Sequence, residues 1–210
     1  MLFRSVVDYE ESCQRANIVI RAGVSVNGAP RLLDAKLAVP LEQFDAASFG
    51  SPFIACAFAP GRRRALALMA VEKGLFHATA LIDPTAAVAR SSRVGDGSFV
   101  NAGAVIGGLS FLGEGVLVNR CASVGHHSII GDYVSIGPGA TLASNIHVGA
   151  GTVIGAGAVI LPNVKIGSNA VIAAGSVVRK TVYDGALVAG NPAKAQRFVP
   201  ARSTDRKRVV

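Results

Sequence analysis

The chain has 210 residues, of which half are hydrophobic, 16% are charged and 6% are aromatic. This length allows one large domain, or a medium and a small one, around a packed core. The net charge of +8 is concentrated in residues 194–210, which carry six basic side chains and one acid. Such a tail can bind nucleic acid or anionic lipid, but a solvated terminus explains it more simply, and no nucleic-acid partner is expected.

The three cysteines, Cys13, Cys56 and Cys121, are an odd number without close spacing. They favour reduced thiols in the cytoplasm over a disulfide framework. The charged residues Arg4 and Asp8 interrupt any apolar stretch near the N-terminus, so no signal peptide is expected. No run of about 18 apolar residues free of polar ones occurs, so no membrane span is expected.

The N-terminal part reads as a small α/β domain. Arg4–Ala16 has the pattern of a helix, and Ile18–Ile20 with Val24–Val26 suggests a strand interrupted by a glycine. Asn27–Gly28 then signals a turn.

The apolar run Phe53–Phe58 is typical of a buried parallel strand. The segment Arg62–Lys73 is predicted to be a helix with Leu66, Met69 and Ala70 on one face, and the glycine that follows it is the expected C-terminal cap. A strand followed by a helix is half of a βαβ unit.

A period of six dominates the rest of the chain. From Ile82 to Val178 every sixth residue is aliphatic, over seventeen consecutive positions. The fourth residue after each is Ala, Ser, Thr or Val except at Ile146, and the next residue is glycine in nine cases. Neither a helix nor a plain strand has this period, but a short strand followed by a tight corner does. Three such sides close a triangular coil, so residues eighteen apart should stack at about 4.8 Å.

Four segments resemble one branch of the hexapeptide-repeat acyltransferases, whose fold is a left-handed parallel β-helix. They are FHATALIDPTA, VNRCASVGHHSIIGD, IGPGATLASNIHVGAGTVIGAGAVILP and LVAGNPAK, within roughly Val71–Arg197. This branch contains the sugar N- and O-acetyltransferases of bacterial surface-glycan pathways, such as the bacillosamine N-acetyltransferases and the sialic acid O-acetyltransferases. The resemblance implies acetyl-CoA as co-substrate, a sugar or nucleotide-sugar substrate, and a homotrimer with active sites between subunits.

The expected fold is therefore mainly β. It comprises a truncated, Rossmann-like α/β domain over residues 1–76, a left-handed parallel β-helix over residues 77–182, and a C-terminal extension with a basic tail over residues 183–210. The truncation is inferred from Met1–Ala16, which lacks glycine. Members of this branch begin with a strand and a Gly-rich turn that brings a helix N-terminus to the sugar nucleotide's phosphates. Here the nucleotide is held differently, or the substrate carries none.

Acetyl transfer needs a base that takes a proton from the attacking amine or hydroxyl, and histidine suits this role near neutral pH. In the resembled family the catalytic histidine falls at the position of His126, so the resemblance implies that His126 is the general base. The residue after it is often acidic in the family, but here it is His127. Protonation of His127 would lower the pKa of His126.

Another carboxylate could replace the missing acid. Asp96, Glu114 and Asp132 are spaced eighteen apart and should stack on a different edge of the prism. Residues of this kind also simply fill the corners between strands.

The co-substrate contacts are expected on several columns. Ser144 should lie directly above His126, and a backbone N–H near it would bind the oxyanion of the tetrahedral intermediate. The resemblance implies that Ser135, Ala156 and Ala174 contact coenzyme A. Because a flat-sided prism has no concave cleft, the resemblance places the His126 edge of one subunit against the Ala156 edge of the next.

Further residues are weaker candidates for contacts with the coenzyme or for the seam between subunits. Pro138 shares the column of small residues, and Arg179, Lys180 and Lys194 could meet the coenzyme's phosphates. A further pair, Asn101 and Asn119, shares a face and could line the seam between subunits.

Three alternatives remain open. A sugar O-acetyltransferase uses the same parts on a hydroxyl. A zinc carbonic anhydrase needs three convergent histidines, whereas His126 and His127 are expected to point apart and His147 to lie on another side, so no metal is expected. A trimeric binding scaffold that has lost catalysis would explain the missing phosphate loop and His127.

Overall fold

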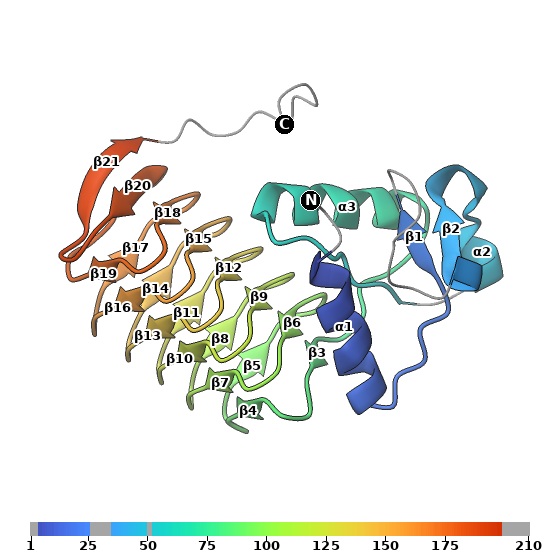
Figure 1. The fold of residues 1–210 in the computed structure, drawn as a ribbon, viewed down its shortest axis with the longest axis horizontal. Coiled ribbons are helices and arrows are strands. Elements are labelled where there is room, and N and C mark those ends of the chain that lie inside the picture. The colour runs from blue at the N-terminus through green and yellow to red at the C-terminus, as the bar shows by residue number, and fades with distance from the viewer. Residues whose placement is uncertain (1–3, 26–34, 50–51, 199–210) are drawn as a thin grey trace.

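The computed structural model describes residues 4–25, 35–49 and 52–198. Its main body is a three-sided prism of stacked coils (Figure 1). Each coil contributes one two-residue strand to each of three parallel sheets, so neighbouring strands in a sheet are eighteen residues apart, as in the pairing of Ser123 with Thr141. This is the left-handed parallel β-helix that the sequence predicts.

The three sheets are called face 1, face 2 and face 3. Face 1 contains β3, β6, β9, β12, β15, β18 and β20, with β21 antiparallel at its end; face 2 contains β4, β7, β10, β13, β16 and β19; face 3 contains β5, β8, β11, β14 and β17. The strand bounds are β3 Leu81–Ile82, β4 Ala87–Val88, β5 Arg93–Val94, β6 Phe99–Val100, β7 Val105–Ile106, β8 Phe111–Leu112, β9 Leu117–Val118, β10 Ser123–Val124, β11 Ile129–Ile130, β12 Ser135–Ile136, β13 Thr141–Leu142, β14 His147–Val148, β15 Val153–Ile154, β16 Val159–Ile160, β17 Lys165–Ile166, β18 Val171–Ile172, β19 Val177–Val178, β20 Ala186–Ala189 and β21 Lys194–Phe198.

The aliphatic repeat positions fill the prism. From Val100 to Val178 every sixth residue is at most 3% exposed. Ile82, the first of the series, is 36% exposed because no earlier coil covers it. Small residues such as Ala104 and Ala140 complete the interior at the corners. Burial of this apolar column supplies the main stabilisation, at about 25 cal/mol per Å² of apolar surface.

The N-terminal part packs beside the first coils (Figure 1). None of the described helices has the length and hydropathy needed to span a bilayer. The elements are α1 (Arg4–Arg15), β1 (Gly23–Ser25), a 3-10 helix (Ala35–Leu37), β2 (Ala38–Pro40), a second 3-10 helix (Leu41–Gln43), α2 (Ala46–Phe49) and α3 (Pro60–Glu72).

Of the strand predicted over Ile18–Ile20 and Val24–Val26, the second part is confirmed by β1, whereas Ile18–Ile20 has no regular structure. The strand predicted over Phe53–Phe58 is wrong, because only Phe53 forms a bridge, with His77. The run is nevertheless buried in part, because Ala55 packs inside and the Ala57 carbonyl accepts a hydrogen bond from a buried arginine. The turn predicted after β1 lies outside the described residues.

The helix α3 confirms its prediction, although it begins at Pro60. Gly74, with φ of +86°, ends it. The Gly74 N–H donates to the Val71 carbonyl at 2.8 Å and Leu75 N–H donates to the Ala70 carbonyl at 3.1 Å, which is a Schellman cap. The buried residues of α3 are Pro60, Arg63 and Ala67, whereas Leu66, Met69 and Ala70, which are predicted to share one face, are partly covered.

Arg63 explains that difference, because its 1%-exposed guanidinium joins the two parts of the chain. Nε donates to the Gly115 carbonyl at 2.7 Å, and Nη2 donates to the carbonyls of Tyr133 and Val134 at 2.9 and 3.0 Å. Nη1 donates to the Ala57 and Phe58 carbonyls. Burial lowers the pKa of this guanidinium to about 10. Backbone carbonyl oxygens thus take the place of the carboxylate with which a buried cation is usually paired.

The helix α1 is held on face 1 by an apolar contact and a buried carboxylate. Tyr9 packs on Phe99 with 4.0 Å between ring centroids. Asp83, with no exposed surface, accepts hydrogen bonds from Ser12 at 2.5 Å and from Arg15 at 2.6 and 2.9 Å. Thr85 donates to its other oxygen. Burial alone would raise the pKa of the Asp83 carboxyl, but these hydrogen bonds outweigh it and hold the pKa well below the usual range.

This carboxylate predicts how stability depends on pH. Because the folded-state pKa of Asp83 is depressed, its contribution is present above the unfolded-state pKa of about 3.9 and is lost as the pH falls below it. Asp83→Asn should lower the free energy of unfolding by about 2 kcal/mol at pH 7 and weaken the loss of stability between about pH 5 and pH 3. Urea unfolding at several pH values measures both effects. Equal pH slopes for the two proteins would contradict this account.

Candidate active site

His126 lies on the edge where the chain passes from face 2 to face 3, in the corner between β10 and β11. This edge is called the His126 edge. Gly125 precedes it because the next coil lies against this position: a Cβ there would be 2.6 Å from the Ala143 carbonyl carbon and 2.8 Å from the Ser144 nitrogen. His127 follows in the left-handed region with φ of +57°. The corner is therefore fixed by its backbone, and both imidazoles are exposed in the single chain.

The two imidazoles of this corner do not point apart, so that expectation is wrong. The Nδ1 atoms of His126 and His127 are 2.8 Å apart, and the rings meet edge to face with 5.0 Å between centroids. The left-handed backbone at His127 turns its side chain back towards its neighbour. His126 therefore has a hydrogen-bond partner, which is an imidazole in place of a carboxylate.

The three stacked carboxylates lie on the edge between face 3 and face 1, away from the His126 edge. They form hydrogen bonds between the corners of successive coils there. Glu114 N–H donates to the Asp132 carboxylate at 3.0 Å, and Gly115 N–H donates to the Asp96 carbonyl at 2.9 Å. Among the described residues no carboxylate forms a hydrogen bond or ion pair with His126 or His127.

Ser144 stacks one coil beyond His126, as the eighteen-residue spacing predicts. Asn145 N–H donates to the His126 carbonyl at 2.9 Å, which joins the two corners. Ser144 accepts through its carbonyl from Asn163 N–H at 3.1 Å. Within the described parts of the chain nothing accepts a hydrogen bond from the Ser144 N–H. An unpaired backbone donor beside a base is what stabilisation of an oxyanion requires.

Exposed apolar side chains surround the His126 edge on faces 2 and 3. Phe111 and Ile129 are paired neighbours on face 3, 50% and 48% exposed. Leu109 occupies the corner one coil before His127 and is 61% exposed, and Val105 on face 2 is 46% exposed. These four residues are called the apolar strip. Large side chains gathered in this way on a surface mark an interaction site.

The predicted coenzyme residues lie elsewhere on the prism. Ala156, Ala174 and Pro138 occupy the edge between faces 1 and 2, called the Ala156 edge, where Ala156 N and Ala174 N pack against glycines of the preceding coils. One chain therefore does not bring His126 and Ala156 together. Ser135 is on face 1, fully buried, and its hydroxyl donates to the Phe58 carbonyl at 2.5 Å. That contact leaves Ser135 no free surface for a cofactor.

The Asn101–Asn119 pair stacks as predicted at the Ala156 edge, with Asn101 Nδ2 donating to Asn119 Oδ1 at 3.1 Å. Asn101 is only 2% exposed, which gives it a role in closing the corner. No group of three or more His, Cys, Asp or Glu side chains in the described part of the chain is close enough to share a metal ion.

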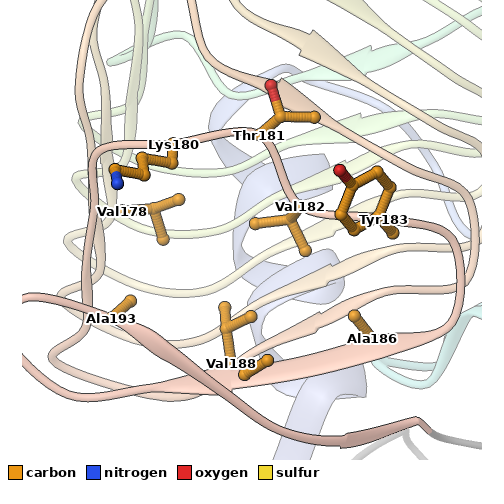
Figure 2. A pocket seen from close by; sticks show the side chains of 9 residues that line it. Val178, Lys180, Thr181, Val182, Tyr183, Ala186, Val188 and Ala193 are labelled. Atoms are coloured by element: carbon orange, nitrogen blue, oxygen red, sulfur yellow. The ribbon is translucent and has the colours of Figure 1, made fainter.

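An open, mainly apolar pocket of about 150 Å³ lies between the segment 178–183 and the β20–β21 hairpin (Figure 2). Val178, Val182, Val188, Lys180 and Tyr183 are among the residues that line it. The sequence analysis selected Lys180 for the coenzyme's phosphates but did not predict this pocket, because the hairpin that forms one side of it lies outside the repeat. The basic tail beyond residue 198 lies outside the described residues.

Comparison with known proteins agrees with this geometry. The family model described as bacterial transferase hexapeptide (six repeats) matches residues 110–144 and 145–180. The acetyltransferase domain of PglB from Neisseria gonorrhoeae, solved in complex with acetyl coenzyme A, is 30% identical over 92% of this chain and 95% of that one, with a TM-score of 0.76. No curated protein matches.

Two further solved structures match over nearly the whole chain. PerB from Caulobacter crescentus, in complex with CoA and GDP-perosamine, is 28% identical over 92% of this chain and 93% of that one, with a TM-score of 0.86. WeeI from Acinetobacter baumannii is 23% identical over 91% and 92% of the two chains, with a TM-score of 0.77, and shares the fold. The similarity therefore includes the N-terminal part as well as the prism.

The close packing at Gly125 gives a test of the corner. Gly125→Ala should lower the free energy of unfolding by about 2 kcal/mol, because the added methyl meets backbone and neither coil can move away. Gly61→Ala is the matched control, since a Cβ at Gly61 has nothing within 4 Å. Thermal unfolding of both variants measures the difference. A Gly125 variant as stable as the control would contradict the packing described for this corner.

Proposed function

Because the chain belongs to the hexapeptide-repeat acyltransferases, we propose that it is an acetyl-CoA-dependent N-acetyltransferase acting on an amino sugar, most simply a nucleotide-linked one, in surface-glycan biosynthesis. The relatives support this choice, since PglB binds acetyl coenzyme A and PerB binds CoA with GDP-perosamine. The observation that carries the proposal is the His126 corner, where an accessible imidazole lies one coil from an unpaired backbone N–H.

The proposed reaction uses these two groups in turn. His126 Nε2 takes a proton from the sugar amine as the amine nitrogen bonds to the acetyl carbonyl carbon. The Ser144 N–H donates to the resulting oxyanion; such a donor typically contributes about 3 kcal/mol. The carbon–sulfur bond then breaks with its electron pair on sulfur, and the thiolate takes the proton from His126. The products are the N-acetyl sugar and free coenzyme A.

We propose further that the enzyme is a homotrimer with its active sites between subunits. A convex edge exposes a base to water, whereas catalysis favours an enclosed site. The apolar strip beside His126 supports a neighbouring chain at this edge. The coenzyme would then lie between the His126 edge of one subunit and the Ala156 edge of the next, where the small Ala156 and Ala174 side chains leave room for the pantetheine arm.

Replacement of the base tests the reaction. His126→Ala should reduce kcat by at least about a hundredfold while leaving the Kd for coenzyme A unchanged, because the imidazole takes part in proton transfer and not in binding the coenzyme. Thiol release with amino sugars and with their hydroxyl counterparts measures turnover and separates N- from O-acetylation; calorimetry measures binding. His147→Ala is the control, since His147 lies on β14 of face 3 and is not hydrogen-bonded to His126 or His127. Near-wild-type turnover in the His126 variant would remove His126 from the mechanism.

The proposed assembly has its own test. Phe111→Glu with Ile129→Glu should convert a trimer into monomers, because two charges would be buried at the seam without partners, and turnover should fall with dissociation. Leu68→Glu is the control, since Leu68 on α3 is similarly exposed, at 53%, but lies outside the apolar strip. Sedimentation velocity and turnover are measured on the same samples. A double variant that stays trimeric and active would refute the assembly.

A further inference from the structure

The contact between the two imidazoles constrains where their protons lie. Two Nδ1 atoms 2.8 Å apart form a hydrogen bond only if one carries a proton and the other does not. If His126 donates, its own Nε2 has a free lone pair. If His127 donates, the neutral His126 carries its proton on Nε2 and cannot act as a base there. The hydrogen bond thus couples the tautomer of His126 to the protonation of His127.

We propose that His127 is a positioning residue, which accepts the His126 Nδ1–H and thereby keeps His126 in the tautomer whose Nε2 can take the substrate's proton. This inference rests on the proposed function and assigns His127 the task that an acid has in the resembled family. When His126 becomes an imidazolium during the reaction, the same hydrogen bond becomes charge-assisted and stronger.

The backbone holds His127 in the orientation that this task needs. Its φ is +57°, and its N–H donates to the Gly108 carbonyl at 3.0 Å. Leu109, one coil earlier in the same column, has φ of +57°, and Asn145 and Asn163, in the next two coils, have φ of +58° and +64°. Both leucine and asparagine therefore occur naturally in this conformation on this column.

Few other charged groups face the pair. On the coil beyond it, the corner carries Ser144 and Asn145, and the next titratable group along that coil is His147 on β14. On the coil before it, the corner carries Gly108 and Leu109; Arg90 and Arg93 lie one coil further away. In the described residues neither ring is hydrogen-bonded or ion-paired to any of these charged groups.

Two substitutions separate the role of acceptor from that of filling space. His127→Leu removes the acceptor in a conformation that Leu109 already adopts; kcat should fall about tenfold, and KM for acetyl-CoA should stay within about twofold. His127→Asn supplies an amide oxygen as acceptor and should restore most of kcat. His147→Leu is the control and should leave kcat unchanged.

A readout that does not depend on turnover completes the test. Nitrogen-15 NMR of labelled histidines should show His126 protonated at Nδ1 and unprotonated at Nε2 in the wild-type protein at neutral pH, and a mixture of tautomers in the His127→Leu variant. Wild-type tautomers and a wild-type kcat in that variant would overturn the inference, as would equal losses of kcat in the leucine and asparagine variants. If the wild-type protein transfers no acetyl group, the proposed function fails, and the NMR measurement still decides whether His127 sets the tautomer.

Discussion

The eighteen-residue register of backbone hydrogen bonds between coils is the constraint on which the rest of the structure depends. Strand residues donate to the next coil, as Ser123 N–H does to the Ala140 carbonyl at 2.9 Å, and corner residues donate back, as Asn145 N–H does to the His126 carbonyl at 2.9 Å. A shift by one residue would exchange the interior and exterior side chains of every strand. The register therefore fixes the aliphatic core and, in the same step, the position of Ser144 above His126.

The three faces of the prism also differ in what packs against them. The N-terminal part covers the first four strands of face 1, where Leu81, Phe99, Leu117 and Ser135 are all buried. It is held there by polar groups that are costly to leave unpaired, the Arg63 guanidinium and the Asp83 carboxylate. No described residue of the N-terminal part covers faces 2 and 3 in this way, so the edge between them, with His126, is exposed within the described part of the chain.

The sequence predicted the prism because each repeat carries its own signal, and seventeen repeats agree on one register. The column arithmetic for Ser144 succeeded for the same reason. The contact between His126 and His127 could not be predicted, since it depends on a left-handed backbone at a histidine, and spacing gives no sign of it. The buried face of α3 was missed because a pattern assigns arginine to the surface, whereas the carbonyls that receive Arg63 come from segments up to 71 residues away.

These properties link assembly to proton transfer. The hydrogen bond between the imidazoles lies within one corner, so under the proposed role of His127 a single chain can hold His126 in the active tautomer. In that chain both rings are exposed, and water would compete for the His126 Nε2 and for the Ser144 N–H. A hydrogen-bond donor stabilises an oxyanion far more in a water-excluded site than in solvent. On the proposed mechanism the chain prepares the base by itself, whereas the water-excluded environment in which the base becomes effective would come from a second chain over the apolar strip.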